Sequence, residues 1–211
     1  MAVKRHVQAR AIAVLAIGYL VGLIAYPNLL GSFLDEKVSA RVLVAFTLPT
    51  TALVIYTLFG SLWKHDRIRS GNGAFEITYH AIVLRVLLFI LALHVLVMIE
   101  LTRAMEAVGL PLVSSRAVVV LLGVMLVTIG NLLPRTRPNV AVGVRTTRTL
   151  ASAQLWQQVH RAGGYATVGL GIVIVITGLV LVHEALAVVI SAAALVAATT
   201  VLISYRRHLR A

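Results

Sequence analysis

Long apolar blocks alternate with short polar segments along this chain. Six such blocks, each about 17 to 23 residues long, cover roughly 11–30, 40–62, 81–101, 117–133, 165–182 and 185–204. An α-helix of this length crosses the hydrocarbon core of a bilayer. The blocks mostly lack the polar positions at every third or fourth residue that mark a helix on a soluble core. The pattern therefore predicts an all-α integral membrane protein with six transmembrane helices.

The first block could instead belong to a signal peptide, because Lys4, Arg5 and Arg10 precede it. It is longer than the apolar region of a signal peptide, and no small-x-small cleavage site is evident before Asp35. We therefore expect it to remain as a helix.

Charge is sparse and unevenly placed. Only 12% of the residues are charged, 60% are hydrophobic and the mean hydropathy is +0.96, whereas about a quarter of a soluble domain is charged. With the N-terminus placed in the cytoplasm, fourteen of the 19 lysines and arginines fall on the cytoplasmic side and four on the other. This bias predicts that both termini face the cytoplasm. The net charge of +12 is then explained by topology, so we expect no direct nucleic acid binding.

A long polar interval separates the fourth and fifth blocks. Residues 131–149 contain four arginines and two prolines but no acidic residue. In residues 150–164, Leu155, Trp156 and Val159 share one helical face, with glutamines and Arg161 opposite. This pattern predicts a short cytoplasmic amphipathic helix, capped by Thr149 or Ser152 and ended by Gly163 and Gly164. Such a helix can lie in the membrane interface or pack under the bundle.

Polar side chains inside the third block are candidates for function. Charged groups at membrane depth are costly, and they are paired, hidden from lipid or extended to the interface. Arg85 is close enough to the inner end of its helix to extend to the headgroups. His94 lies deeper, where a hydrogen bond to another helix is the expected role and proton transfer the alternative. Glu100 is expected at the outer interface.

Proline and glycine mark helix distortion and packing. Pro49 lies within the second block between threonines and predicts a kink. Glycines recur at 163, 164, 169, 171 and 178, which indicates close helix contact within lipid. The triplet Asn-Leu-Leu occurs at 28–30 and again at 131–133, at opposite membrane faces on this topology. This repetition suggests an inverted repeat, with an N-terminal three-helix half over 1–116 and a second half over 117–211.

Motifs of known enzymes are missing from the sequence. There is no H-E-x-x-H, G-x-S-x-G or phosphate-binding loop, and cysteine is absent. Glu76 and His80 form one helical pair, which is too few ligands for a metal. We therefore expect no catalytic residue, no metal and no cofactor.

Turn-forming residues indicate that the interval after the fourth block is a folded loop. Pro134 and Pro138 end the helix, and Asn131 and Asn139 are turn formers. Gly143 allows the chain to turn before Arg145 and Thr146. His160 and Arg161 can bind a headgroup phosphate or a carboxylate, or they can complement a helix C-terminus. The alternative is an ordinary positively charged cytoplasmic loop, but such a loop would require only basic residues and not these turn-forming residues.

These residues also resemble a known family. Residues 130–164 match the pattern G-N-x-x-P, then P-N, G-[IV]-R-T, T-L with a following W, and H-R before glycine, which is the signature of the bacterial SdpI family. The elements are carried by Gly130, Asn131, Pro134, Pro138, Asn139, Gly143, Val144, Arg145, Thr146, Thr149, Leu150, Trp156, His160, Arg161 and Gly164. The chain departs from the family at Ala153 and Gln154, where acidic residues are common, and after the first helix.

The resemblance implies a multi-pass protein of the bacterial cell membrane, in contact with its lipids. It implies immunity against a secreted peptide toxin, with signalling by sequestering a cytosolic repressor at the membrane. The loop residues that match the signature would then form the binding surface. A small transporter or channel built on the inverted repeat is the alternative, and a membrane enzyme acting on lipid-linked substrates is a third.

Overall fold

The computed structural model describes residues 2–29, 38–70, 73–102 and 115–180, and the architecture below concerns these residues. Their regular secondary structure is helical, and no strand occurs among them. The long helices are α1 (Ala2–Ala25), α3 (Val38–Ser70), α4 (Gly73–Leu101), α6 (Ser115–Gly130) and α8 (Ala153–Val180). Short helical segments are η1 (Tyr26–Asn28), η2 (Leu133–Arg135) and α7 (Thr147–Ala151).

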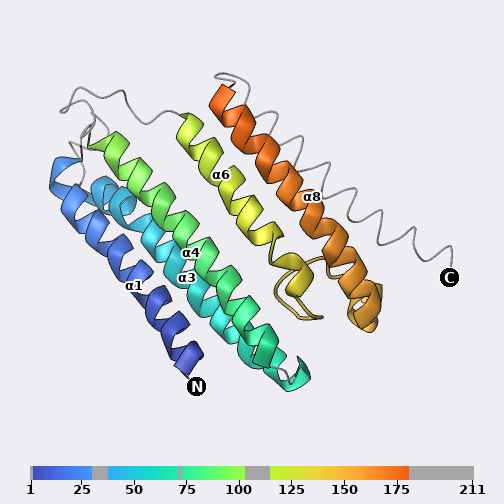
Figure 1. Ribbon diagram of the computed structural model, residues 1–211. Coiled ribbons are helices and arrows are strands. Elements are labelled where there is room, and N and C mark those ends of the chain that lie inside the picture. Colours follow the sequence, from blue (N-terminus) through green and yellow to red (C-terminus); the bar gives the residue numbers. More distant parts are fainter. Residues whose placement is uncertain (1, 30–37, 71–72, 103–114, 181–211) are drawn as a thin grey trace.

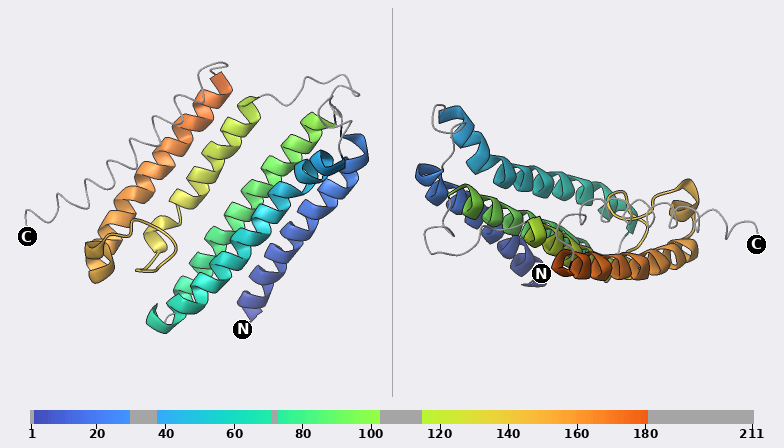
Figure 2. Two further views of the ribbon diagram at one scale, coloured as in Figure 1. Left: turned by 180° about the vertical axis from the view of Figure 1, so that it is seen from behind. Right: turned by 90° about the horizontal axis from the view of Figure 1, so that it is seen from above.

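The long helices run side by side in two groups (Figures 1 and 2). Helices α1, α3 and α4 contact one another, α6 and α8 form a pair, and α4 contacts α6. The start of α1, the end of α3 and the loop after α6 lie at the same end of the molecule (Figure 1).

Five helices are long and apolar enough to cross a membrane: Gln8–Asn28, Ala40–His65, Phe75–Leu101, Arg116–Arg135 and Ala153–Val180. Their side chains face outward over much of their length, as lipid-facing helices require. The first five predicted spans are thus present as helices. The predicted sixth span, 185–204, lies outside the described residues, and the orientation in the membrane stays a prediction.

The predicted separate amphipathic helix is wrong. Its residues form the first turns of α8, which continues through Gly163 and Gly164 to Val180. Both glycines are buried, and a Cβ on Gly164 would lie only 2.8 Å from the carbonyl oxygen of Gly130 in α6. Contact with α6 therefore offsets the roughly 1 kcal/mol by which glycine weakens a helix. The helical structure is interrupted at Ser152, between α7 and α8. The Oγ of Ser152 accepts the N–H of Leu155 at 3.2 Å.

Glycines form the seam between α6 and α8. Gly123 and Gly130 are seven residues apart on α6, and they meet Gly171 and Gly164, which are seven apart on α8. A Cβ on Gly123 would lie 2.7 Å from the Gly171 oxygen, so the backbones touch directly. The predicted packing role is confirmed for Gly164, Gly171 and Gly178. It is wrong for Gly169, which has no neighbouring atom within 4 Å of its Cβ position.

Helices α1 and α3 also meet at a glycine. Pro49 lies inside α3, so the carbonyl of Ala45 lacks its usual helical donor. Gly22 of α1 lies against this carbonyl, and any Cβ there would clash with its oxygen. The hydroxyl groups of Tyr19 and Thr50 are 3.2 Å apart and link the same two helices. The kink expected at Pro49 stays a prediction.

Candidate functional site

The candidate site is the segment 130–164, called here the signature loop. It leaves α6, forms η2, crosses an extended stretch, forms α7 and enters the first turns of α8. In Figure 1 it projects at the end of the molecule that also holds the start of α1.

Trp156 is the centre around which the signature loop folds. Its side chain is fully buried, and its indole N–H donates to the Thr136 hydroxyl at 3.2 Å. Thr136 in turn donates to the carbonyl of Leu133 at 2.7 Å. The Trp156 ring stacks on the His160 ring, with centroids 3.9 Å apart and planes 13° apart. This side chain therefore joins η2 to α8.

His160 is a structural acceptor rather than an exposed ligand. It is 1% exposed, and its Nε2 accepts the backbone N–H of Val144 at 2.9 Å. Since that donor is an N–H, Nε2 must carry a lone pair. The proton then belongs to Nδ1, which donates to the carbonyl of Trp156 at 2.8 Å. Both ring nitrogens are occupied, so the predicted phosphate or carboxylate contact of His160 is wrong, and so is a role at a helix C-terminus.

Gly143 permits the contact between Val144 and His160. Its φ of +108° is one that residues with side chains rarely adopt. A Cβ at this position would also clash with Nε2 of His160. Glycine is thus required for two separate reasons.

Asn139 organises the turn before Gly143. Its side chain is 2% exposed. The amide NH₂ donates to the carbonyls of Arg137 at 2.7 Å and Val142 at 3.0 Å. Its oxygen accepts the N–H groups of Ala141 at 2.9 Å and Val142 at 2.7 Å. All its hydrogen-bonding capacity is used within the loop, so the predicted turn-forming role of Asn139 is confirmed, and its place on a binding surface stays a prediction.

Two threonines cap α7. The Thr146 hydroxyl accepts the N–H of Thr149 at 3.2 Å, and the Thr149 hydroxyl accepts the N–H of Thr146 at 2.9 Å. Thr149 is fully buried and also donates to the carbonyl of Val144 at 2.7 Å. Thr149 therefore caps a helix as predicted, though it caps α7 and not α8.

Three further signature residues lie near the exit from α6. Pro134 packs against Gly164, where an added Cβ would lie 2.8 Å from Cδ of Pro134. Pro138 is half-buried, while Asn131 is exposed just after α6. These positions shape the exit from α6.

Arginines cover the outside of the signature loop. Arg135, Arg137, Arg145, Arg148 and Arg161 are all exposed. The sequence has no aspartate or glutamate between positions 106 and 184, so no carboxylate of this segment balances them. The loop thus combines a hydrogen-bonded interior with a basic exterior.

The tip of the signature loop reaches the other helix group. Ala141 and Val142 pack against a buried cluster that includes Trp63, Phe75 and Tyr79. Trp63 and Tyr79 have ring centroids 4.8 Å apart, and the Tyr79 hydroxyl donates to the carbonyl of Phe59 at 2.8 Å. No sequence pattern predicts this contact, since Ala141 and Val142 are small apolar residues in a polar loop.

The polar residues predicted within the membrane lie away from the signature loop. Arg85 is half-buried and donates to the carbonyl of Ala81 at 2.9 Å, toward the start of α4. Glu100 is half-buried near the end of α4. His94 is fully buried, and its ring lies against the backbone of Gly18 in α1. Neither ring nitrogen meets hydrogen-bond geometry with the described residues, so the predicted hydrogen bond from His94 to another helix stays a prediction.

His94 lines a cavity of about 10 Å³ together with Gly18 and Pro49. This volume is at the lower limit for a single water molecule. The three residues come from α4, α1 and α3, so the cavity lies inside the first helix group.

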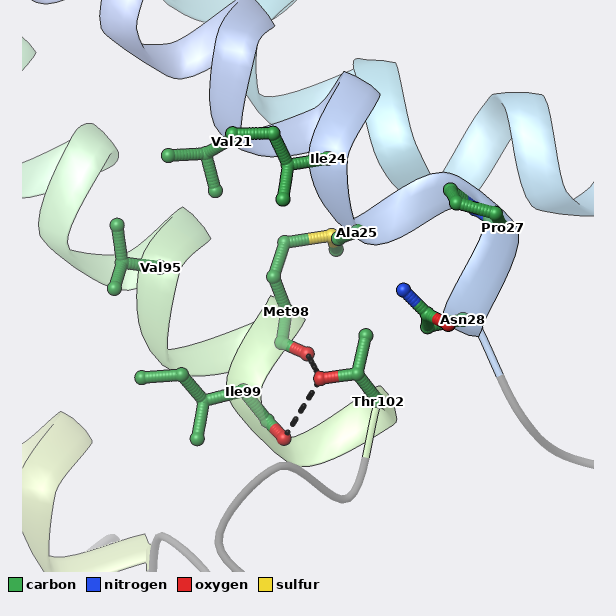
Figure 3. A pocket seen from close by; sticks show the side chains of 9 residues that line it. All are labelled: Val21, Ile24, Ala25, Pro27, Asn28, Val95, Met98, Ile99 and Thr102. Atoms are coloured by element: carbon green, nitrogen blue, oxygen red, sulfur yellow. Dashed lines mark hydrogen bonds between the residues drawn. The ribbon is translucent and has the colours of Figure 1, made fainter.

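A larger cavity of about 590 Å³ lies between α1 and α4 (Figure 3), at the end of the molecule away from the signature loop. Val21, Ile24, Val95 and Ile99 supply apolar walls. The hydroxyl of Thr102 donates to its own helix, to the carbonyl of Met98 at 2.8 Å. No pattern in the sequence predicts this cavity. Its walls offer little to select a polar ligand.

Clusters of three or more histidines, cysteines, aspartates or glutamates that could hold a metal are absent from the part of the chain that the structure describes. In that same part, the signature loop contains one histidine and no acidic residue. Its chemistry is therefore limited to hydrogen bonding and positive charge.

The helices and the loop together indicate a helical membrane protein with a folded basic segment between two of its long apolar helices. Residues 135–205 match the model of the SdpI/YfhL protein family, and this match supports assigning that part of the chain to the SdpI family. The match begins within η2 and includes the positions from Pro138 to Arg161. No curated protein and no solved structure shows a significant match. The family is not known as a family of enzymes.

Proposed function

We propose that the protein is an SdpI-type immunity protein of the bacterial cell membrane, which protects the cell against a secreted antimicrobial peptide toxin. We further propose that the signature loop is the surface through which it acts on a cytosolic partner, such as a repressor held at the membrane. The observation that supports this most is the division of the loop into a hydrogen-bonded interior and an arginine-bearing exterior.

The interior of the loop favours a scaffold over a ligand pocket. Asn139, Thr149 and His160 are each at most 2% exposed and bonded to the loop itself. A catalytic or ligand-binding group needs unused donors or acceptors directed at its target. We therefore assign recognition of the partner to the outer, arginine-bearing face of the signature loop.

The outer face suits a partner with carboxylates or phosphates. Guanidinium groups present five donors in a planar arrangement that fits these anions in a bidentate manner. Arg135, Arg137, Arg145 and Arg161 are exposed around one folded segment, so their spacing is fixed by the scaffold. With both termini in the cytoplasm, this face is available to a soluble acidic protein.

Survival under toxin challenge tests the proposal. A toxin-sensitive bacterial strain expressing this chain is plated against the peptide toxin that SdpI-type proteins counter, with an empty vector as the control. We expect at least tenfold higher survival with the chain. Equal survival at a verified membrane level of the protein would refute immunity against this toxin.

A transporter or channel is the second candidate, and the buried His94 beside a small cavity in the first helix group favours it. Ion flux into proteoliposomes that is lost in His94→Ala would support this function. The cavity beside His94 is too small for a continuous water path, so we expect no flux. A membrane enzyme finds no comparable support.

A further inference from the structure

The tip of the signature loop, residues 139–142, is attached to both helix groups. On one side the loop is bound to α8, because Nε2 of His160 accepts the N–H of Val144 at 2.9 Å. On the other side, Ala141 and Val142 pack against the buried cluster that residues of α1, α3 and α4, the first helix group, form. The tip therefore joins the two groups in addition to the direct contact between α4 and α6.

The turn that carries Val142 is held together as a unit by Asn139. Its Oδ1 accepts the N–H of Val142 at 2.7 Å, and its Nδ2 donates to the carbonyl of Val142 at 3.0 Å. The same Nδ2 donates to the carbonyl of Arg137 at 2.7 Å, and Arg145 follows Val142 by three residues. The position of Val142 thus determines where Arg137 and Arg145, two exposed members of the arginine-bearing face, are held.

The two attachments of the loop differ in kind. The attachment to α8 consists of hydrogen bonds to buried side chains, since His160 is 1% exposed and the fully buried Thr149 donates to the carbonyl of Val144 at 2.7 Å. Breaking such bonds leaves buried groups unsatisfied. The attachment to the first group consists of two half-buried apolar side chains, which gain only part of the free energy of full burial. The contact of the tip with the first group is therefore the one that opens first.

We propose that Val142 is a positioning residue, through which the first helix group sets the position of the arginine-bearing face. With Val142 on the cluster, Arg137 and Arg145 are held in one place relative to the membrane helices. When the tip leaves the cluster, the loop keeps its internal hydrogen bonds, but its arginines are no longer fixed to the first group. A rearrangement of α3 or α4 would then change recognition by the loop.

This inference rests on the proposed function, because the arginine-bearing face is the surface assigned to the partner. It adds the regulation of that surface. The position of the loop can be measured without toxin or partner, so the structural part of the inference can be tested by itself.

Distances between two spin labels test the proposal, since the sequence contains no cysteine that would have to be removed. Thr147→Cys on α7 and Ser61→Cys on α3 place the labels at exposed positions, and Ser61 lies two residues before Trp63 of the cluster. Double electron–electron resonance of the full chain in nanodiscs gives the distribution of distances between the loop and the first group. We expect a single narrow distribution.

Substitutions of Val142 should widen this distribution. Val142→Asp places a carboxylate against an apolar cluster and should widen it at least twofold. Val142→Thr keeps the shape but adds a hydroxyl group, so an intermediate width is expected. Val142→Ile keeps the apolar contact and should keep the narrow distribution. Leu150→Asp is the matched control, because Leu150 is a loop side chain that is 44% exposed, and it should leave the width unchanged.

Two further measurements separate displacement of the tip from unfolding and from loss of function. The ¹⁵N signals of the His160 ring should be the same in Val142→Asp and the wild type, because the bond to Val144 persists. Survival under toxin challenge should fall at least tenfold in Val142→Asp at an equal membrane level and should be retained in Val142→Ile. If the wild type itself gives no protection, the proposed function fails, while the distances still decide the position of the loop.

Three results would overturn the inference. The first is a distribution in Val142→Asp and Val142→Thr as narrow as that of the wild type, or one equally widened in Leu150→Asp. The second is a change in the His160 signals of Val142→Asp, which would show that the loop does not keep its interior when the tip leaves. The third is full protection by Val142→Asp despite a widened distribution.

Discussion

At Gly143 the backbone turns with φ +108° directly against the His160 ring. Gly143→Ala places a Cβ both in a disfavoured backbone region and against Nε2. We expect the free energy of unfolding to fall by about 2 kcal/mol or more, since strained backbone costs about 1–3 kcal/mol and a lost hydrogen bond adds to it. Unfolding of the purified protein in mixed detergent micelles measures the change.

Gly169→Ala is the control for that substitution. Gly169 is helical and has open surroundings, so alanine should leave stability unchanged or raise it by up to about 1 kcal/mol. Equal stability of Gly143→Ala and the wild type would contradict the proposed contact with His160.

The proton on His160 provides a second test at the residue scale. Because Nε2 accepts the N–H of Val144, the ring must be neutral with its proton on Nδ1. We expect ¹⁵N NMR of histidine-labelled protein in nanodiscs to show this tautomer at neutral pH, with His160→Gln used to assign the signal. A proton on Nε2 would show that the loop is folded differently.

Residue identity predicted the turns of the signature loop but not the roles of its polar groups. Gly143, Pro134 and the threonine cap follow from backbone preferences that act locally. The Asn139 amide binds nearby backbone, as its turn-forming role predicts. His160 was expected to contact a phosphate or a carboxylate, yet its ring binds the loop itself. The same imidazole can serve either purpose, and what decides is its contact with Val144, 16 positions away, just as the indole of Trp156 meets Thr136, 20 positions away. No local pattern contains that information.

At the scale of elements, the seam between α6 and α8 is the most sensitive feature. Gly171→Leu would force a side chain against the Gly123 oxygen, 2.7 Å from the Cβ position. We expect a loss of about 1–3 kcal/mol, as for overpacked cores, measured by the same unfolding assay. Gly169→Leu lies two residues away, on an exposed face, and should have little effect. A comparable loss of stability in Gly171→Leu and Gly169→Leu would show that the loss does not come from the contact between α6 and α8.

The course of α8 shows why element boundaries were harder to predict than elements. The apolar blocks identified the first five spans because hydropathy acts over about 20 residues. Glycine is a weak helix former, so the local sequence at Gly163 and Gly164 predicts a helix end. Contact with Gly130 reverses this local preference, and that contact depends on the whole helix pair.

At the scale of the molecule, the absence of cysteine makes topology directly testable. Arg145→Cys lies on the signature loop and Asn28→Cys in η1, at the opposite end, and both positions are exposed. We expect a membrane-impermeant maleimide to label Asn28→Cys in intact cells, and Arg145→Cys only after permeabilisation. The reverse pattern would place the signature loop outside the cell.

The central claim is that the arginine face of the signature loop carries the protective function. It is tested most directly by the survival of toxin-challenged cells expressing a variant with glutamine at Arg135, Arg137, Arg145 and Arg161. These side chains are exposed, so the fold should persist, and a variant with lysine at the same positions controls for charge alone. We predict survival at the level of the empty vector for the glutamine variant and partial protection for the lysine variant. Full protection by the glutamine variant, at a membrane level equal to that of the wild type, would contradict the account.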